Sequence, residues 1–238
     1  MRIDNGAPGP TARAAGAFYL ITFLAGPVAL YAGRRIVVSG DVAATAANIR
    51  AHGSLLLVSF ADFLLMTASY VVVTGLFYEL FRPVDRTASR VAAFFSLVGC
   101  AVQGAACLFL LAPITLLGEA PYLEVFRMEQ RQALAFLSLR LHTYGFNVGI
   151  VFFAFYCLLI GFLILRSTFL PSVLGVGMLL AGLGWLTSLW PPLARSLSPY
   201  VLVPGFVGEG SLTLWLLFKG VDVRRWWQQA GAEAVSAA

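Results

Sequence analysis

The chain has 238 residues, of which 60% are apolar and only 11% are charged. Soluble globular domains carry about 45–50% apolar and about 25% charged residues, so this composition leaves too little charge for a water-facing surface. It excludes a disordered, a collagen-like and a disulfide-scaffold chain. The net charge of +5 comes from cations scattered between apolar blocks, which also excludes a nucleic-acid-binding surface. The composition predicts a polytopic membrane protein, with the lipid bilayer as its partner.

Six apolar stretches are long enough to cross a bilayer core about 30 Å thick, which takes about 20 helical residues. They are residues 14–33, 54–80, 90–118, 135–165, 171–189 and 200–219. These runs are apolar on all faces, whereas a transmembrane barrel strand alternates over about ten residues. We therefore predict an all-α, polytopic integral membrane bundle of six transmembrane helices.

The domain organisation follows from the spans. The loops are too short for a separate soluble domain, so we predict one transmembrane domain over residues 14–219. A polar N-terminal segment, residues 1–13, precedes it, and residues 220–238 form a tail. The first span is longer than a signal-peptide core, so we expect the chain to retain it. The connections 34–53 and 119–134 are long enough to contain short surface helices.

The basic residues indicate an orientation. With six spans both termini share one side, which holds nine Lys and Arg residues against seven on the other side. The nine are Arg2, Arg13, Arg82, Arg86, Arg90, Arg166, Lys219, Arg224 and Arg225. The positive-inside rule then places both termini in the cytoplasm. In the tail, two Trp residues follow two Arg residues at 224–227, a pattern typical of an interfacial helix that touches anionic headgroups.

Four segments share their order and spacing with a known family. They are Tyr78–Arg86 (YELFRPVDR), His142–Phe146 (HTYGF), Gly161–Gly175 (GFLILRSTFLPSVLG) and Pro204–Gly220 (PGFVGEGSLTLWLLFKG). In these segments the chain resembles the bacterial membrane family catalogued as domain of unknown function 4386, over about residues 14–221. The resemblance implies a multi-pass protein of the bacterial inner membrane. It implies no activity, so any site has to be argued from the residues.

Four polar side chains fall inside the predicted spans. Asp62, Gln103, His142 and Glu209 lie in the second, third, fourth and sixth span respectively. An ionisable group costs about 2.5–3.5 kcal/mol at the centre of an inserted helix, so such residues indicate a function by default. Their distances from the span ends, at about 1.5 Å per residue, give depths of about 10–15 Å from the non-cytoplasmic boundary. We therefore predict that the four converge on one internal pocket that opens to the non-cytoplasmic side.

The neighbours of these residues support an inward orientation. His142 shares a helix face with Gly145 and Gly149, a Gly-x-x-x-Gly pair that lets another backbone come close. Glu209 shares its face with Gly205 and Thr213. A carboxylate that faced lipid at this depth would be too short to reach the interface.

Three interpretations of the polar cluster stay open. In the first, Asp62, Gln103, His142 and Glu209 bind a small solute, an ion or a proton. In the second, Asp62, His142 and Glu209 bind a divalent metal, and a metal-bound water performs hydrolysis. In the third, the cluster is a hydrogen-bonded network that fixes the helix packing and has no catalytic site. The chain contains no catalytic motif, so the sequence predicts no catalytic residue, substrate or oligomeric state.

The cysteines and two of the tryptophans are interpreted as structural residues. Cys100, Cys107 and Cys157 lie inside spans without a Cys-x-x-Cys pair, so we expect small packing residues and no disulfide framework. Trp185 and Trp215 lie near the ends of spans, where Trp typically anchors a helix at the membrane interface.

Overall fold

The computed structural model describes residues 7–197, 200 and 202–236, and this part of the chain is helical with no β-strand. Its six longest apolar helices are α1 (Pro8–Ile36), α2 (Val42–Phe81), α3 (Arg86–Leu116), α4 (Met128–Arg166), α5 (Ser172–Leu186) and α7 (Leu202–Phe218). Shorter helices are η1 (Pro121–Leu123), η2 (Thr187–Leu189), α6 (Pro191–Ser196) and α8 (Val223–Ser236). The predicted all-α membrane bundle is confirmed.

Each predicted span corresponds to one of the six helices. Five stretches are long and apolar enough to cross a membrane, namely α1 to α4 and the run Ser172–Leu189 from α5 through η2. The sixth, α7, is apolar but has only 17 residues. The predicted starts differ most for α2 and α4, because both helices begin in polar sequence before the apolar run. α2 departs from helical geometry at His52, so the part before it bends away from the span.

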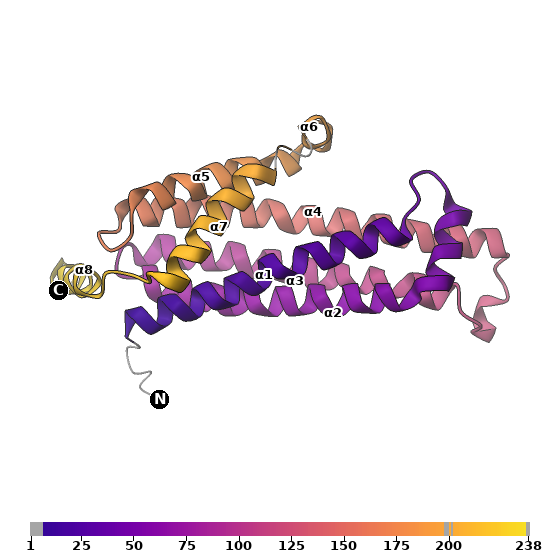
Figure 1. Ribbon diagram of the computed structural model, residues 1–238, viewed down its shortest axis with the longest axis horizontal. Coiled ribbons are helices and arrows are strands. Elements are labelled where there is room, and N and C mark those ends of the chain that lie inside the picture. The colour runs from indigo at the N-terminus through magenta and orange to yellow at the C-terminus, as the bar shows by residue number, and fades with distance from the viewer. Residues whose placement is uncertain (1–6, 198–199, 201, 237–238) are drawn as a thin grey trace.

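The helices have unequal lengths, and this shapes the bundle (Figure 1). α1 to α4 run along its long axis, whereas α5 and α7 cover only one half of it. At that half lie the start of α1, the α2–α3 turn, the α4–α5 turn and α8, and we call it the terminal end. The opposite end, which holds the α1–α2 connection and the α3–α4 connection, is the distal end.

The six long helices form a closed ring. Each of α1 to α5 packs on the next long helix in the chain, and α7 packs on both α5 and α1. α2 and α4 also touch across the middle. Short connections explain the order, because a helix that turns back after a few residues has to lie beside the helix that precedes it.

Glycines bring α7 close to both of its neighbours. A Cβ atom added to Gly177 of α5 would lie 3.2 Å from the Cα of Gly208 in α7. A Cβ atom added to Gly16 of α1 would lie 2.5 Å from the backbone nitrogen of Leu217 in α7. Small residues at membrane helix interfaces permit such backbone contact. The glycines therefore fix α7 between α1 and α5 at the terminal end.

α3 contains Pro113 near its end and continues through it to Leu116. Cys100, Cys107 and Cys157 are all free thiols in the buried core. They act as small packing residues, as the sequence indicates.

Candidate functional site

Glu209 in α7 is held by hydrogen bonds from three other helices. Tyr19 of α1 donates its hydroxyl proton to Oε2 of Glu209 over 2.5 Å, and Tyr70 of α2 donates to the same oxygen over 2.9 Å. Trp185 of α5 donates its indole N–H to Oε1 over 2.6 Å. The Glu209 side chain is 7% exposed. Four helices of the ring thus meet at a single buried carboxyl group.

Aromatic contacts orient the two tyrosines. The buried ring of Tyr19 lies edge-on against Tyr70 and Phe77, with ring centroids 5.4 Å and 5.9 Å away. Tyr70 also lies against Phe153 of α4, at 4.5 Å. Edge-to-face packing of this kind restricts the rings, and buried phenols seek a polar partner for their hydroxyl groups. The hydroxyl groups find that partner in Glu209.

Two glycines of α7 make room for this arrangement. Gly208, next to Glu209, touches the backbone of α5 at Gly177. Gly205 lies directly beneath the indole ring of Trp185, where an added Cβ atom would collide with the ring. A larger residue at position 205 would therefore push the indole away from the carboxyl group. The spacing of the two glycines along α7 is what lets Trp185 reach Glu209.

Gln103 lies across the ring from Glu209, on α3. Its side chain packs against Gly149 of α4, where an added Cβ atom would collide with it. The side chain is only 4% exposed. Within the described residues its amide group forms no hydrogen bond. The amide atoms are not among the fully buried polar atoms that lack a partner, and the residue lines a cavity, so its polar atoms can meet something that enters there.

Gln103 and Glu209 both line one cavity of about 180 Å³ inside the ring. All six long helices contribute to its wall, and apart from Thr22 the other lining residues are apolar or aromatic. The lining residues are Thr22, Phe23, Gly26, Met66, Tyr70, Gln103, Phe146, Ile150, Phe153, Trp185, Gly205, Phe206 and Glu209. A concave apolar wall with a few convergent polar groups is the usual form of a small-molecule site.

His142 is buried, but it lies outside the lining of this cavity. Its Nδ1 atom is 3.1 Å from the backbone oxygen of Ala106 in α3. Its ring meets the edge of Phe63 in α2 at a centroid distance of 4.9 Å. The imidazole therefore has one hydrogen-bond partner on the neighbouring helix and aromatic packing beside it.

Asp62 is the fourth residue of the predicted cluster, and it also lies outside the lining. Its side chain is half-buried on α2, beside Phe63. It forms no hydrogen bond or ion pair within the described part of the chain. Asp62 is therefore placed differently from Glu209, whose carboxyl group is enclosed.

The structure does not assemble the predicted metal triad of Asp62, His142 and Glu209. Across residues 7–197 and 202–236, no three His, Cys, Asp or Glu side chains stand close enough together to hold a metal ion. The oxygens of Glu209 are instead directed at Tyr and Trp donors. In the described part of the chain, the groups bonded to the Glu209 carboxyl are thus two phenols and an indole N–H, and no second carboxylate or imidazole joins them.

Unequal helix lengths explain why the four residues do not form one layer. The depth argument assumes that the second, fourth and sixth spans enter the membrane at one level. α2 and α4 extend past the end of α7 towards the distal end (Figure 1). Asp62 and His142 precede the ends of α2 and α4 by 19 and 24 residues, whereas Glu209 precedes the end of α7 by nine (81 − 62, 166 − 142 and 218 − 209). All three helices end at the terminal end, so Asp62 and His142 lie nearer the distal end, although all three residues are seven to nine residues from the predicted span starts.

Sequence reasoning overlooks three residues of this site: Tyr19, Tyr70 and Trp185. Trp185 was expected to anchor its helix at the membrane interface, and instead donates its N–H to a buried carboxyl group. The sequence does hold one indication of them: buried Tyr and Trp side chains need a partner for their polar group, and a buried Glu209 needs hydrogen-bond donors. To predict a pair as far apart in sequence as Tyr19 and Glu209, one has to know how the helices are arranged.

Comparison with known proteins gives a family and no activity. No curated protein matches the chain, and no solved structure matches it. The sequence model of one family, described as Domain of unknown function (DUF4386), matches residues 14–220, which include the ring except for the first residues of α1, and every residue that lines the cavity. The chain belongs to this family.

Proposed function

We propose that this membrane protein binds a small amphiphilic molecule inside the ring, with a protonated amine against Glu209 and an apolar body in the aromatic part of the cavity. The observation that carries the proposal is the pairing of an enclosed carboxyl group with the unpartnered amide of Gln103 on the wall of one cavity. Each property of the ligand follows from the groups that would contact it.

The size of the cavity sets the size of the ligand. Its volume is about 180 Å³. A dry, apolar cavity of about 150 Å³ is enough to hold benzene. The site therefore accommodates a molecule with a single ring or a short branched chain. The rings of Phe146, Phe153 and Phe206 would cover such a body.

The charge of Glu209 favours a cationic head. An ionised carboxylate has about four acceptor positions, and Tyr19, Tyr70 and Trp185 occupy three of them. One position is left for a ligand. No Lys, Arg or His forms an ion pair with Glu209 in the described part of the chain. A buried carboxylate without a counter-ion is costly, and an ammonium group would supply both the charge and the missing donor.

The aromatic residues add to this preference. The faces of Trp and Tyr rings attract a cation within about 6 Å, by about 2 kcal/mol when the pair is desolvated. Tyr70 and Trp185 both line the cavity beside Glu209. Gln103 can accept a second N–H or donate to a carbonyl or hydroxyl group of the ligand.

The seam between α1 and α7 offers a route of entry. Gly26 of α1 is exposed, and an added Cβ atom there would meet nothing within 4 Å. Phe206 of α7 is 55% exposed. The two helices touch at Gly16 and diverge from there along the bundle (Figure 1), and Phe23 of α1 meets Phe206 across the seam at a ring-centroid distance of 6.0 Å. A ligand dissolved in the bilayer would therefore enter sideways, between the helices.

A proton relay receives less support from the geometry. The hydroxyl groups of Tyr19 and Tyr70 lie 3.2 Å apart and both reach Glu209. The next buried polar pair, Thr74 and Ser96, is joined by its own hydrogen bond, and Thr74 also donates to the backbone oxygen of Tyr70, but neither bonds to the phenol or carboxyl groups. The chain of hydrogen bonds therefore ends inside the bundle, and a relay needs a path to both faces.

Ligand-dependent thermal stability tests the proposal. We expect phenylethylamine to raise the Tm of the protein in nanodiscs, whereas phenylethanol, which has the same ring and no positive charge, raises it far less. In the Glu209→Gln variant, phenylethylamine should no longer raise the Tm. Asp62→Asn, which removes a carboxyl group outside the cavity, is the matched control and should keep the Tm shift. Equal effects of amine and alcohol, or an amine effect that survives Glu209→Gln, would contradict the proposal.

We further propose that the protein lies in the bacterial inner membrane with its terminal end in the cytoplasm. The excess of Lys and Arg at the terminal end supports this orientation. Reporter fusions after residue 87 and after the C-terminus should both report the cytoplasm. A fusion in the 119–134 connection that reports the cytoplasm would reverse the orientation.

A further inference from the structure

The C-terminal helix α8 is fastened across the terminal end of the bundle. In Figure 1 it is seen nearly end-on, so it runs at a steep angle to the long helices. The buried side chain of Trp226 donates its indole N–H to the backbone oxygen of Leu80, at the end of α2, over 2.8 Å. An amphipathic helix in this position lies along the membrane interface.

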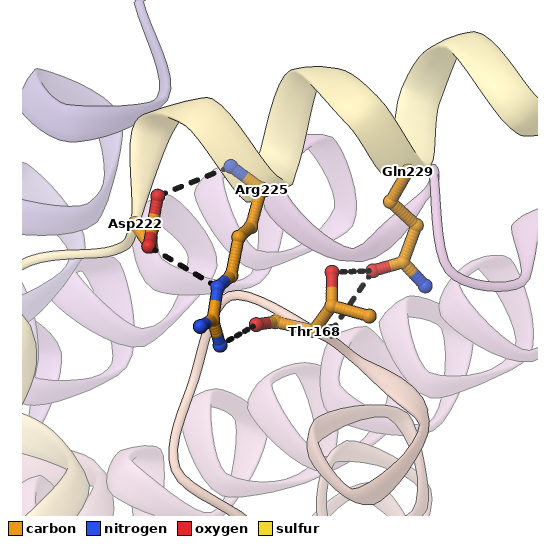
Figure 2. Close-up of polar contacts among 4 residues, drawn as sticks. All are labelled: Thr168, Asp222, Arg225 and Gln229. Atoms are coloured by element: carbon orange, nitrogen blue, oxygen red, sulfur yellow. Dashed lines mark hydrogen bonds and ion pairs between the residues drawn. The ribbon is translucent and has the colours of Figure 1, made fainter.

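Polar contacts fasten the same helix to the α4–α5 turn (Figure 2). Asp222 accepts from the backbone N–H of Arg225 over 3.1 Å and pairs with its guanidinium group at 3.4 Å. Arg225 in turn donates to the backbone oxygen of Thr168 over 3.3 Å. Gln229 accepts from the backbone N–H and the hydroxyl group of Thr168, over 3.0 Å and 3.1 Å. The position of α8 is thus set by two anchors rather than by the lipid alone.

Between α8 and the α2–α3 turn there is a cavity of about 450 Å³. Two arginines and two tryptophans dominate its lining, and no acidic residue takes part. The lining residues are Arg82, Pro83, Arg86, Trp226, Trp227, Ala230 and Gly231. This cavity is separate from the one at Glu209 and shares no residue with it.

The acidic residues near this cavity are already paired. Glu79 pairs with Arg82 at 3.1 Å, and Asp85 pairs with Arg166 at 3.4 Å. Asp85 also caps α3 by accepting from the backbone N–H of Ala88. The exposed Arg86 has no ion-pair partner in the described part of the chain. Its charge therefore stays available to a ligand in the cavity.

We infer that this cavity binds the phosphate group of an anionic lipid. A guanidinium group binds phosphate oxygens through paired N–H donors. Basic pockets at the cytoplasmic ends of membrane helices suit anionic headgroups, and tryptophan prefers the headgroup level. The exposed ring of Trp227 lies at the rim of the cavity, where it would contact the glycerol backbone and upper acyl chains. The lipid would bridge α8 and the α2–α3 turn.

Lipid-dependent stability of the full-length protein tests this inference. We expect short-chain phosphatidylglycerol to raise the Tm of the detergent-solubilised protein more than phosphatidylcholine of the same chain length. Arg86→Gln should weaken the apparent affinity for phosphatidylglycerol by about fivefold, the effect of one basic residue at an anionic lipid surface. Arg90→Gln, one turn further along α3, exposed and outside the cavity lining, is the matched control and should leave the affinity unchanged.

Two results would overturn the inference. Equal loss of phosphatidylglycerol affinity in Arg86→Gln and Arg90→Gln would mean that only the general surface charge matters. Inorganic phosphate that acts alone as strongly as phosphatidylglycerol would assign the site to a free anion instead of a lipid. The Tm of each variant without lipid shows that it is folded, so a lost lipid effect can be attributed to binding.

Discussion

Glu209 and His142 are both buried ionisable side chains in the same bundle, yet their surroundings differ. Glu209 receives hydrogen bonds from three helices and borders a cavity. His142 has one backbone partner and otherwise packs against an aromatic ring. The half-buried Asp62 has no partner in the described part of the chain. The cost of burying a polar group in a membrane therefore identifies candidate residues, whereas the number and direction of their hydrogen-bond partners distinguish a binding site from a packing contact.

The largest expected effect is on stability at Glu209. Glu209→Leu removes the acceptor of three buried donors, and each unsatisfied donor costs at least about 1 kcal/mol, so we expect a loss of about 3 kcal/mol in the free energy of unfolding. Asp62→Leu removes a carboxyl group that satisfies nothing and should cost less than about 0.5 kcal/mol. Reversible unfolding in mixed micelles measures both. Similar losses of unfolding free energy in the two variants would show that the Glu209 carboxyl group contributes no more to stability than that of Asp62.

A smaller effect is expected from the donors. Tyr19→Phe removes one hydrogen bond and keeps the ring, and such interhelical bonds in membranes contribute about 0.6 kcal/mol, up to about 1.7 kcal/mol. A double-mutant cycle of Tyr19→Phe with Glu209→Gln should show coupling within this range. The same cycle with His142→Asn in place of Glu209→Gln should show none. Coupling of Tyr19 to His142 as strong as that to Glu209 would join the two regions into one network.

Two glycines of α4 distinguish the cavity at Glu209 from the surroundings of His142, because each packs in one of these two regions. An alanine at Gly149 would collide with Gln103 at the cavity wall, and an alanine at Gly145 would lie 2.7 Å from the Cβ atom of Ala106, whose backbone oxygen partners His142. Both substitutions should cost about 1–3 kcal/mol through overpacking. Only Gly149→Ala should also reduce the Tm shift caused by phenylethylamine. A reduced shift in Gly145→Ala would show that the cavity extends to the histidine.

The smallest effect is expected at Asp62. Asp62→Asn keeps the shape of a side chain that has no partner, so the free energy of unfolding should change by less than about 0.5 kcal/mol. Amine binding should be unchanged within error. Titration of the variant with phenylethylamine checks this, and a loss of binding there would place Asp62 in the ligand path.

The fold was predictable from the sequence because a membrane-spanning helix can be recognised by the length of its apolar run. The six spans and the absence of a disulfide framework follow from composition and periodicity. The starts of α2 and α4 were not predictable from apolar runs, since polar residues continue both helices. That error then misplaced Asp62 and His142 in depth, because it concealed how far these two helices extend beyond α7.

The site was predictable only in part, for a similar reason. The sequence marks Gln103 and Glu209 as costly residues inside spans, and the structure places both on one cavity wall. The partners of Glu209 could not be chosen from eight Tyr and five Trp residues without the order of helices around the ring. Closure of the ring by α7 on α1 is what brings Tyr19 to a residue near the other end of the chain.

Infrared difference spectroscopy on amine binding shows whether the Glu209 carboxyl group receives the ligand. The spectrum of the protein in nanodiscs is recorded with and without phenylethylamine, and the carboxyl region is compared between variants. Ammonium binding at Glu209 should produce a carboxyl difference band that is absent in Glu209→Gln and present in Asp62→Asn. A band that persists in Glu209→Gln, or that disappears in Asp62→Asn, would contradict the claim that the enclosed carboxyl group of α7 receives the ligand.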